Sequence, residues 1–459
     1  MFTDAIFQSF ATKRPIAVMS QLALCRLLDG DLVDEIFSNH AEQQYQRTLL
    51  FSSLTKLMSS VVMSKHASVN AAYKKMKAEL GVSLNAVYNK LDRVEPVISQ
   101  ALVRHSYQQI AEIRKDIGGN RGNDLPGYRT RIFDGNHIGK TEHRLKETRD
   151  ITAAPLPGKS LVVLDPRFEA IADYFCIEDG HAQERSALDE LLTTVKPNDL
   201  WVGDRNFCTI KPICEIHRRK AAFIIRHHKN LIGESLGKRR KTGQTETGTV
   251  YERTMTISIN RQGETMTLRR IEVDLFQPTR DGDTTISILT NLPTDVADAT
   301  KVAELYRTRW KIETAFQVLT TTLNCEINTL CYPKAALFVF ALALVAYNSL
   351  AVIQAVIAKG RGREFAQQMS YYYMALEIAE TTDGMLVALP LEKWIKASRT
   401  TLKKFNLQLL KIAANIDLSI YQKSTRGPKK SKPKKKHLKN KVHVSTAKIL
   451  AQRKLDSAC

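Results

Sequence analysis

The spacing of apolar residues changes near residue 129, and this change constrains the fold more than any other feature. Segments 129–136, 160–167 and 170–179 are rich in β-branched and aromatic residues and are separated by turn residues, which predicts three strands. The pattern then predicts a helix, a strand, a helix and a strand at 184–195, 199–206, 209–220 and 221–228. Strands followed by helix–strand alternation indicate an α/β fold with a mixed sheet.

Other patterns flank this core. We expect a helical N-terminal domain at 1–115, the first part of the core at 129–228, an antiparallel β insertion at 229–292, helices at 298–420 and a basic tail at 423–459. The tail segment 423–441 contains ten Lys and Arg, no acidic residue and almost no apolar residue, so we expect a disordered polycationic arm.

One apolar stretch raises the question of a membrane span. Residues 335–357 approach the about 20 residues that a spanning helix needs. The stretch contains Tyr347, Asn348, Ser349 and Gln354, which favours a helix buried in a large protein core. We therefore predict no membrane association.

Charge and cysteine usage restrict the partners and the compartment. The 459-residue chain carries a formal net charge of +21, which favours a polyanionic partner, and nucleic acid is the simplest candidate. The seven cysteines form no CxxC pair and are odd in number, which indicates a reducing compartment. The N-terminus lacks the pattern of a signal peptide, so we expect a cytoplasmic protein.

A helix, a turn at Gly81 and a second helix opened by Ser83 are predicted between residues 69 and 94. This is helix-turn-helix spacing, and Asn89 and Arg93 are candidates for DNA contact, with Asn85 and Tyr88 beside them. A purely structural helical hairpin is the alternative reading.

Two carboxylates follow predicted strands. Asp134 ends `RIFD` and Asp204 ends `LWVGD`, and carboxylates at strand ends of an α/β sheet face the crevice where such folds bind ligands. Glu313 would be a third carboxylate of the site. Hard oxygen ligands suit Mg²⁺ or Mn²⁺, and such a cluster is typical of two ions that drive in-line attack on a phosphodiester. Each Asp alone would also serve as an ordinary turn residue.

The segment 304–321, `ELYRTRWKIETAFQVLTT`, predicts one amphipathic helix. Its apolar stripe would contain Leu305, Ile312, Phe316, Leu319 and Leu323. A second stripe beside it would contain Tyr306, Arg309, Glu313 and Thr320, with Trp310 just beyond. Glu313 would then emerge at a cleft, although a helix with a solvated flank is the plainer reading of the pattern.

These motifs together resemble a known family. The spacing Tyr306, Arg309, Glu313 is similar to the signature of bacterial DDE transposases of the insertion-sequence-four family. `FDGN` and `GDRNF` resemble the two Asp segments of that family, and `EDGHAQERS` resembles another of its runs. The resemblance covers about 129–420 and includes a β insertion between the second Asp and the Glu. The family's usual Lys lies seven residues after the Glu, where this chain has Thr320.

The resemblance implies a ribonuclease H-like catalytic domain that excises and inserts mobile DNA. Asp134, Asp204 and Glu313 would be catalytic and would hold two Mg²⁺ or Mn²⁺ ions, while Tyr306 and Arg309 would contact phosphate. Trp310 is the candidate for stacking on a base flipped out of the duplex. The implied partners are double-stranded DNA, as transposon ends and target, and a second copy of the chain in a synaptic homodimer near the bacterial nucleoid. The alternatives are a non-catalytic DNA-binding relic and a metal-dependent nuclease without strand transfer.

Overall fold

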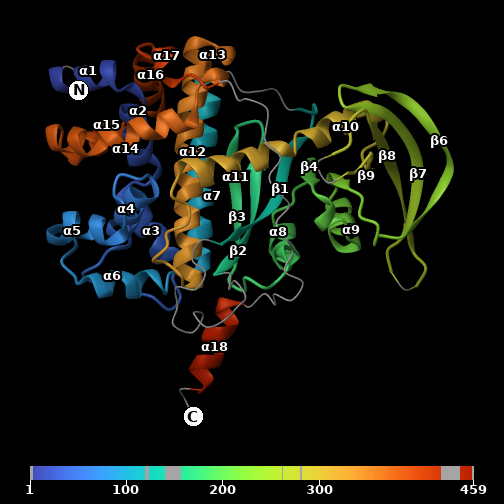
Figure 1. Cartoon of the computed structure of the whole chain (residues 1–459), viewed down its shortest axis with the longest axis horizontal. Coiled ribbons are helices and arrows are strands. Elements are labelled where there is room, and N and C mark those ends of the chain that lie inside the picture. Colours follow the sequence, from blue (N-terminus) through green and yellow to red (C-terminus); the bar gives the residue numbers. More distant parts are fainter. Residues whose placement is uncertain are drawn as a thin grey trace.

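The computed structural model describes residues 4–118, 124–139, 157–260, 262–279, 282–424 and 445–456. Helices occupy one side of the molecule, a sheet occupies the centre, and a curved extension of the sheet forms the other side (Figure 1). Most of the tail segment predicted at 423–441 lies outside the described residues. Beyond it, a helix, α18, spans Thr446–Asp456.

All nine strands of the described residues form one sheet with the order β3-β2-β1-β4-β5-β9-β8-β7-β6. Their bounds are β1 Arg129–Ile138, β2 Gly158–Asp165, β3 Ala170–Ile177, β4 Asp199–Gly203, β5 Ala222–Arg226, β6 Gly233–Thr245, β7 Gly248–Ser258, β8 Thr265–Leu275 and β9 Thr285–Thr290. Strands β1, β2 and β3 are antiparallel neighbours, whereas β4 and β5 run parallel to β1. This mixed order confirms the α/β fold class with a mixed sheet that the sequence predicted.

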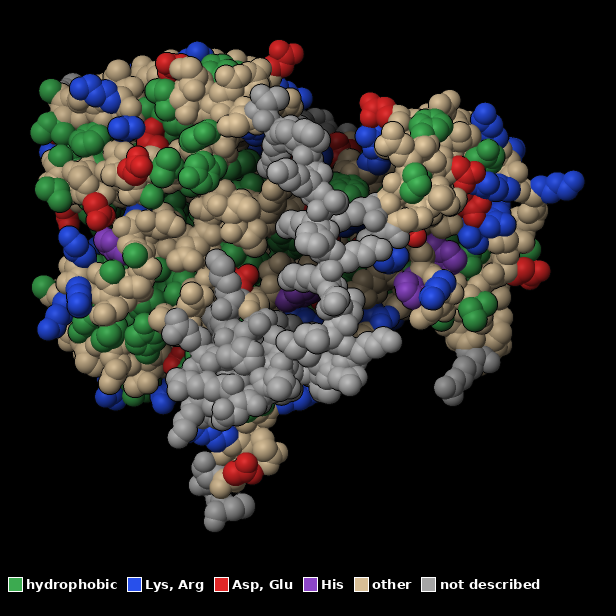
Figure 2. Space-filling model, viewed as in Figure 1, with side chains coloured by type: hydrophobic (Ala, Val, Ile, Leu, Met, Phe, Trp, Pro, Cys, Tyr) green, Lys and Arg blue, Asp and Glu red, His purple; other side chains and the backbone are tan. Residues whose placement is uncertain are grey.

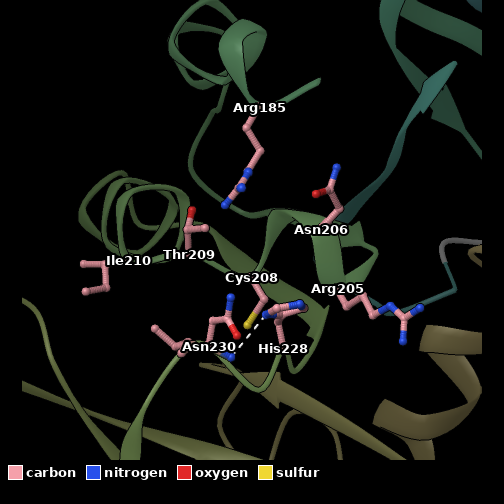
Figure 3. A pocket seen from close by; sticks show the side chains of 9 residues that line it. Arg185, Arg205, Asn206, Cys208, Thr209, Ile210, His228 and Asn230 are labelled. Carbon is pink, nitrogen blue, oxygen red and sulfur yellow. Dashed lines mark hydrogen bonds between the residues drawn. The ribbon is translucent and has the colours of Figure 1, made fainter. Parts of the chain in front are cut away.

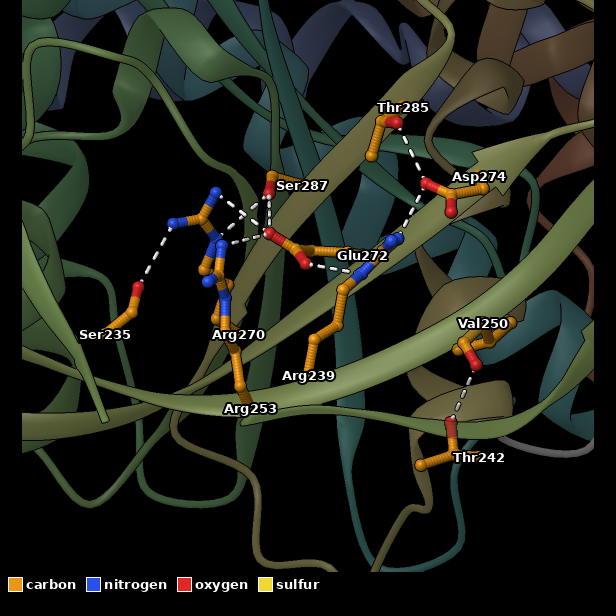
Figure 4. Close-up of polar contacts among 10 residues, drawn as sticks. All are labelled: Ser235, Arg239, Thr242, Val250, Arg253, Arg270, Glu272, Asp274, Thr285 and Ser287. Atoms are coloured by element: carbon orange, nitrogen blue, oxygen red, sulfur yellow. Dashed lines mark hydrogen bonds and ion pairs between the residues drawn. The ribbon is translucent and has the colours of Figure 1, made fainter. Parts of the chain in front are cut away.

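The predicted β insertion continues the core sheet. Strands β6 to β9 are antiparallel, as expected, and β9 pairs with both β8 and the core strand β5. On one face of this extension, Arg239, Arg253 and Arg270 converge on buried Glu272 at 2.7–2.9 Å (Figure 4). One carboxylate thus links β6, β7 and β8.

Helices cover both faces of the core strands. The helices of the N-terminal part are α1 Ala5–Lys13, α2 Pro15–Leu27, α3 Gly30–His40, α4 Phe51–Val62, α5 Val69–Leu80, α6 Leu84–Leu91 and α7 Pro96–Ile117. Within the core lie η2 Glu184–Ala187, α8 Leu188–Thr193, η3 Arg205–Phe207 and α9 Ile210–Arg218. After the sheet come α10 Ala299–Arg307, α11 Trp310–Thr322, α12 Pro333–Arg361, α13 Arg363–Gln368, α14 Tyr371–Ala388, α15 Leu391–Ser398, α16 Leu402–Ala413 and α17 Leu418–Tyr421.

The long apolar stretch forms most of α12. Its most apolar window of 18 residues is entirely buried, which agrees with a core helix, although by length and composition alone it is the one described helix that would span a membrane. Helix α12 packs along α7, and both lie against the β3 side of the sheet (Figure 1). Asn348 of α12 accepts a hydrogen bond from the backbone N–H of Ile171 in β3 at 2.7 Å. The helical N-terminal part is therefore packed directly on the core strands of the sheet through α7 and α12.

The single helix predicted at 304–321 is wrong, because the structure has two helices separated at Thr308 and Arg309. The carbonyl of Leu305 accepts from both the N–H and the hydroxyl of Thr308, at 3.1 and 2.7 Å. The N–H of Arg309 therefore bonds to Tyr306 three residues back, and the regular i→i−4 ladder is interrupted. Leu305, Ile312 and Leu319 are nevertheless buried, as the apolar stripe predicted.

Candidate active site

The alternation of side chains along β1 and β4 places both aspartates on the same face of the sheet. Ile132 on β1 and Val202 on β4 are fully buried in the core beneath α10 and α12, and Asp134 and Asp204 each lie two residues farther on. Parallel pairing of β1 with β4 ends at Phe133 and Gly203, so both carboxylates follow the last paired residues. The structure therefore brings these two predicted residues to one face of the sheet.

A glycine permits the close approach of the two strands. A Cβ atom on Gly203 would lie 2.6 Å from the ring of Phe133, which fills that space. The same ring packs against Phe207 with centroids 4.8 Å apart. Gly203 and the Phe133 ring therefore fix the backbone immediately beside Asp204 and Asp134.

The junction between α10 and α11 brings three more predicted residues to this face. The Nη1 atom of Arg309 donates to Oδ2 of Asp134 at 3.2 Å, and its Nη2 donates to Oε1 of Glu313 at 2.7 Å. The hydroxyl of Tyr306 donates to Oδ1 of Asp204 at 3.5 Å. Five of the predicted site residues thus lie together at this face.

The sheet extension positions this junction. Arg269 on β8 donates to the carbonyls of Leu292 and Ala297 at 2.9 and 2.7 Å, and it also pairs with Glu252 on β7. Ala297 lies just before α10, whose N-cap Asp298 accepts from the N–H of Lys301 at 2.7 Å. The extension therefore anchors the start of α10, and with it the helix that carries Tyr306.

Burial and charge strongly perturb the groups of this cluster. Desolvation raises the pKa of Asp134 to about 7, against the stabilising charge of Arg309 and the N–H of Gly135, and with further repulsion from Asp204 and Glu184. Burial also raises the pKa of Tyr306 far above its usual value. Burial lowers the pKa of Arg309, but Tyr306 and the surrounding carboxylates outweigh it and raise that pKa above its usual value. Arg309 is therefore a permanent cation among competing carboxylates.

Two buried donors in the cluster have no partner among the described residues. They are the Nε of Arg309, a residue that is only 7% exposed, and the Nδ2 of Asn136. Asn136 lies two residues after Asp134 on β1 and so faces the same way. A buried donor without an acceptor costs about 1–3 kcal/mol, so both atoms are suited to an oxygen-rich ligand.

Glu184 was not identified as a site residue from the sequence. Its side chain fills the space that a Cβ on Gly135 would occupy. Its Oε2 accepts from Nδ2 of Asn206 at 2.7 Å, and its Oε1 lies 3.9 Å from Nδ1 of His137. The run `EDGHAQERS` pointed to this segment, but no spacing rule singled out Glu184 because it approaches from a separate turn.

The remaining predicted residues lie outside these contacts. Trp310 is 61% exposed at the start of α11, with the guanidinium of Arg309 5.7 Å from its ring centroid. The hydroxyl of Thr320 bonds to carbonyls of its own helix. Asn89 and Arg93 are exposed on α6 and just after it, where Gly81 and the Ser83 cap form the predicted turn.

The carboxylate oxygens of Asp134, Asp204 and Glu313 are ligands that suit a hard divalent cation, but they are not arranged as a metal site in this structure. Within the described ranges, no three His, Cys, Asp or Glu side chains converge closely enough to hold an ion. The guanidinium of Arg309 lies between Asp134 and Glu313 and neutralises them. A cation at this place would need Arg309 to release at least one of them.

Comparison with known proteins found a family match and similar solved structures. Residues 126–349 match the family model described as the transposase DDE domain, and this range contains all three carboxylates. One matching solved structure, a cryo-EM piggyBac transposase synaptic complex with hairpin DNA, is 12% identical and covers 90% of this chain and 87% of that chain with a TM-score of 0.40. No curated protein matches the sequence. The match over residues 126–349 supports a DDE transposase.

Proposed function

We propose that this protein is a cut-and-paste DNA transposase that resembles the insertion-sequence-four family. It would bind the inverted-repeat ends of an insertion sequence, cleave them and join them to target DNA. One observation carries the proposal: the junction between α10 and α11 holds Tyr306 and Arg309 against Asp204 and Asp134, with Glu313 one turn farther on. The DDE match supports the same class of chemistry.

Asp134, Asp204 and Glu313 would hold the divalent metal, because their carboxylate oxygens are the ligands that Mg²⁺ and Mn²⁺ prefer. Bound there, two such ions would supply the charge that activates a nucleophile and stabilises the leaving oxygen of a phosphodiester. The raised pKa of Asp134 supports this assignment, since an ionised carboxylate that is costly to bury gains most from a nearby cation. Glu313 retains a 41% exposed side chain and so opens toward solvent.

Arg309 and Tyr306 would bind the phosphate at the cut. Arg309 has a fixed planar fork of donors, and its Nε has no acceptor among the described residues, so a phosphate oxygen would complete its hydrogen bonds. Asn136 offers a second such donor on the same face. Movement of Arg309 from the carboxylates to the phosphate would expose Asp134 and Glu313 when DNA arrives.

Other surfaces would add affinity for DNA, recognise the transposon ends and pair them. Exposed Asn89 and Arg93 would read the ends, the basic tail would add sequence-independent attraction, and exposed Trp310 would stack on a base. Lys and Arg side chains also lie along the outer margin of the sheet extension (Figure 2), where β6 presents exposed Lys238, Arg240 and Lys241. A homodimer would pair the two ends.

The test is a strand-transfer reaction with pre-cut end DNA and a target plasmid in Mg²⁺. We expect covalent joining of the end's 3′ hydroxyl to the target, lost in Asp204→Asn. Cleavage of uncut ends without any joining would favour the nuclease alternative. Specific binding of ends without cleavage or joining in either Mg²⁺ or Mn²⁺ would favour the non-catalytic relic.

A further inference from the structure

A pocket of about 260 Å³ is lined in part by Arg205 and Asn206, the two residues that follow Asp204 in the chain (Figure 3). It is formed where the carboxyl ends of β4 and β5 meet the start of α9. Its lining comes from η2, from the segment 205–210 and from the loop after β5. Because ligands bind at the carboxyl ends of parallel strands in open α/β sheets, this is the place where the fold would be expected to hold one.

The polar side of the pocket favours an anion. The side chain of Arg185 extends from η2 toward Thr209, whereas the guanidinium of Arg205 points away from the centre (Figure 3). The Nε and Nη2 atoms of Arg185 bond to the amide oxygen of Gln183, and no carboxylate among the described residues pairs with it. Its full charge and its Nη1 donors therefore stay available. Thr209 is the N-cap of α9, and its hydroxyl makes no capping bond.

The opposite side of the pocket is apolar. Buried Cys208 and Leu231 form this wall, and burial raises the pKa of the Cys208 thiol to about 11, so the thiol stays neutral. His228 accepts from the N–H of Asn230 at 3.1 Å through Nδ1, which leaves its other nitrogen as a further polar group. The pocket is smaller than the about 300–1,000 Å³ typical of sites for drug-sized ligands. One cation, two polar groups and an apolar wall fit a phosphate with its attached sugar.

We propose that this pocket binds a non-scissile phosphate of the DNA strand that enters the carboxylate site, with the adjoining deoxyribose against Cys208 and Leu231. The proposal rests on the proposed function, because it names a contact with the same substrate. Arg185 would provide the charge, and Thr209 would add a hydroxyl donor. Phosphates recur about every 3.4 Å of helix axis along each strand, so a neighbour of the phosphate at Asp204 comes within reach of residues 205–209.

Glu184 and Arg185 connect the two sites. Glu184 lies over Gly135, the residue after Asp134, and its charge also acts on the Asp134 carboxyl, while the next residue, Arg185, reaches into the pocket. The single turn η2 therefore touches both places. A strand bound in the pocket would be held in a fixed register relative to the carboxylates, which is a positioning effect on cleavage.

The experiment is a scan of end DNA in which single phosphates near the cut are replaced by neutral methylphosphonates. Binding is measured by fluorescence anisotropy in Ca²⁺ and cleavage in Mg²⁺. The scan compares the parent protein with Arg185→Gln and with a matched control, Arg218→Gln. The control removes a charge at the far end of α9, where Arg218 pairs with Glu215 at 2.7 Å. Thermal melting verifies that each variant is folded.

In the parent, we expect one non-scissile position at which methylphosphonate weakens binding about tenfold or more, as for a lost charged hydrogen bond. Arg185→Gln should bind unmodified DNA more weakly than the parent by about the same factor. Its affinity should not fall further when that one phosphate is modified, because the two changes remove one shared contact. Arg218→Gln should give the parent profile.

A folded Arg185→Gln protein with the full parent profile would overturn the pocket assignment while leaving the proposed function intact. The pocket assignment also fails if deoxyadenosine monophosphate binds the parent saturably in an Arg185-dependent way while the scan is flat, since the pocket would then serve a free nucleotide. A parent protein that neither binds nor cuts end DNA would overturn the proposed function, and this inference with it.

Discussion

The Nη1 atom of Arg309 lies 3.2 Å from Oδ2 of Asp134, although 175 residues separate them in the chain. The same guanidinium donates to Glu313, so one side chain connects strand β1 with helix α11. It does so from the interruption between α10 and α11, where Thr308 diverts the carbonyl of Leu305. The candidate site is therefore assembled around the guanidinium of Arg309.

Replacing Arg309 with Lys tests the role of its planar fork. Lysine keeps the charge but offers a point charge, which cannot span two carboxylates and a phosphate in a fixed geometry. We expect Arg309→Lys to fold and bind end DNA yet cleave about 10²-fold or more slowly, as for loss of a preorganised charge-stabilising donor. Single-turnover cleavage measures the rate. If Arg309→Lys cleaved within about twofold of the parent rate, the planar fork of Arg309 would not be needed for cleavage.

Adding one methyl group at Gly203 should disturb the two aspartates through Phe133. The Cβ of Gly203→Ala would lie 2.6 Å from the Phe133 ring, so the ring or the strand must shift. We expect a loss of about 1–3 kcal/mol in the free energy of unfolding, measured with urea, together with slower cleavage. Gly384→Ala is the control, because that helical glycine has open space around it, and it should be neutral or slightly stabilising. Equal effects of the two substitutions would contradict the packing argument.

The pKa of Asp134 predicts a pH-dependent difference in stability without metal. Its folded pKa of about 7 is above the ordinary 3.8, so the folded state holds a proton that the unfolded state releases between these values. The contribution of Asp134 to stability is therefore present below about pH 4 and is lost as pH rises through 7. Asp134→Asn cannot ionise. In EDTA, its melting temperature relative to the parent should rise between pH 5 and pH 8, and a constant difference would show that Asp134 is not destabilised by burial.

The helical hairpin formed by α5 and α6 should determine sequence discrimination if it reads the transposon ends. Contacts to base edges contribute about 1–3 kcal/mol each, so Asn89→Ala and Arg93→Ala should each reduce the preference for end DNA over random DNA about tenfold. Lys411→Ala, an exposed charge on α16, is the control and should leave the preference unchanged. Competition binding at a fixed salt concentration measures the ratio. Unchanged discrimination in both hairpin variants would assign this hairpin a structural role.

Local patterns predicted most of the fold because they report burial directly. Alternation in β1 and β4 placed Asp134 and Asp204 on one face, and the apolar stripe identified the buried side of α10 and α11. The pattern could not show the interruption at Thr308, because it arises from a side-chain hydroxyl competing for one backbone carbonyl. Such a local bond leaves the apolar period almost unchanged.

Other parts of the site depend on contacts between distant segments. Glu184 packs over Gly135 only because that residue lacks a side chain, and the pocket lined by Arg185 and Arg205 needs η2, η3 and the loop after β5 to meet. The spacing of residues in the sequence predicts neither of these contacts. The continuity of β9 with β5 likewise depends on strand pairing between segments that alternation alone leaves unassigned.

The measurement that tests the central claim most directly is Mg²⁺-dependent nicking of end DNA by Glu313→Gln. This substitution keeps the shape of a 41% exposed side chain and removes its charge, so folding and DNA binding should be preserved. Glu304→Gln, an exposed residue of α10, is the matched control and should nick at the parent rate. We predict no nicking by Glu313→Gln in Mg²⁺, as for Asp134→Asn and Asp204→Asn, with partial recovery in Mn²⁺, which tolerates poorer geometry than Mg²⁺. Nicking by Glu313→Gln at the rate of the parent protein would contradict the assignment of this site.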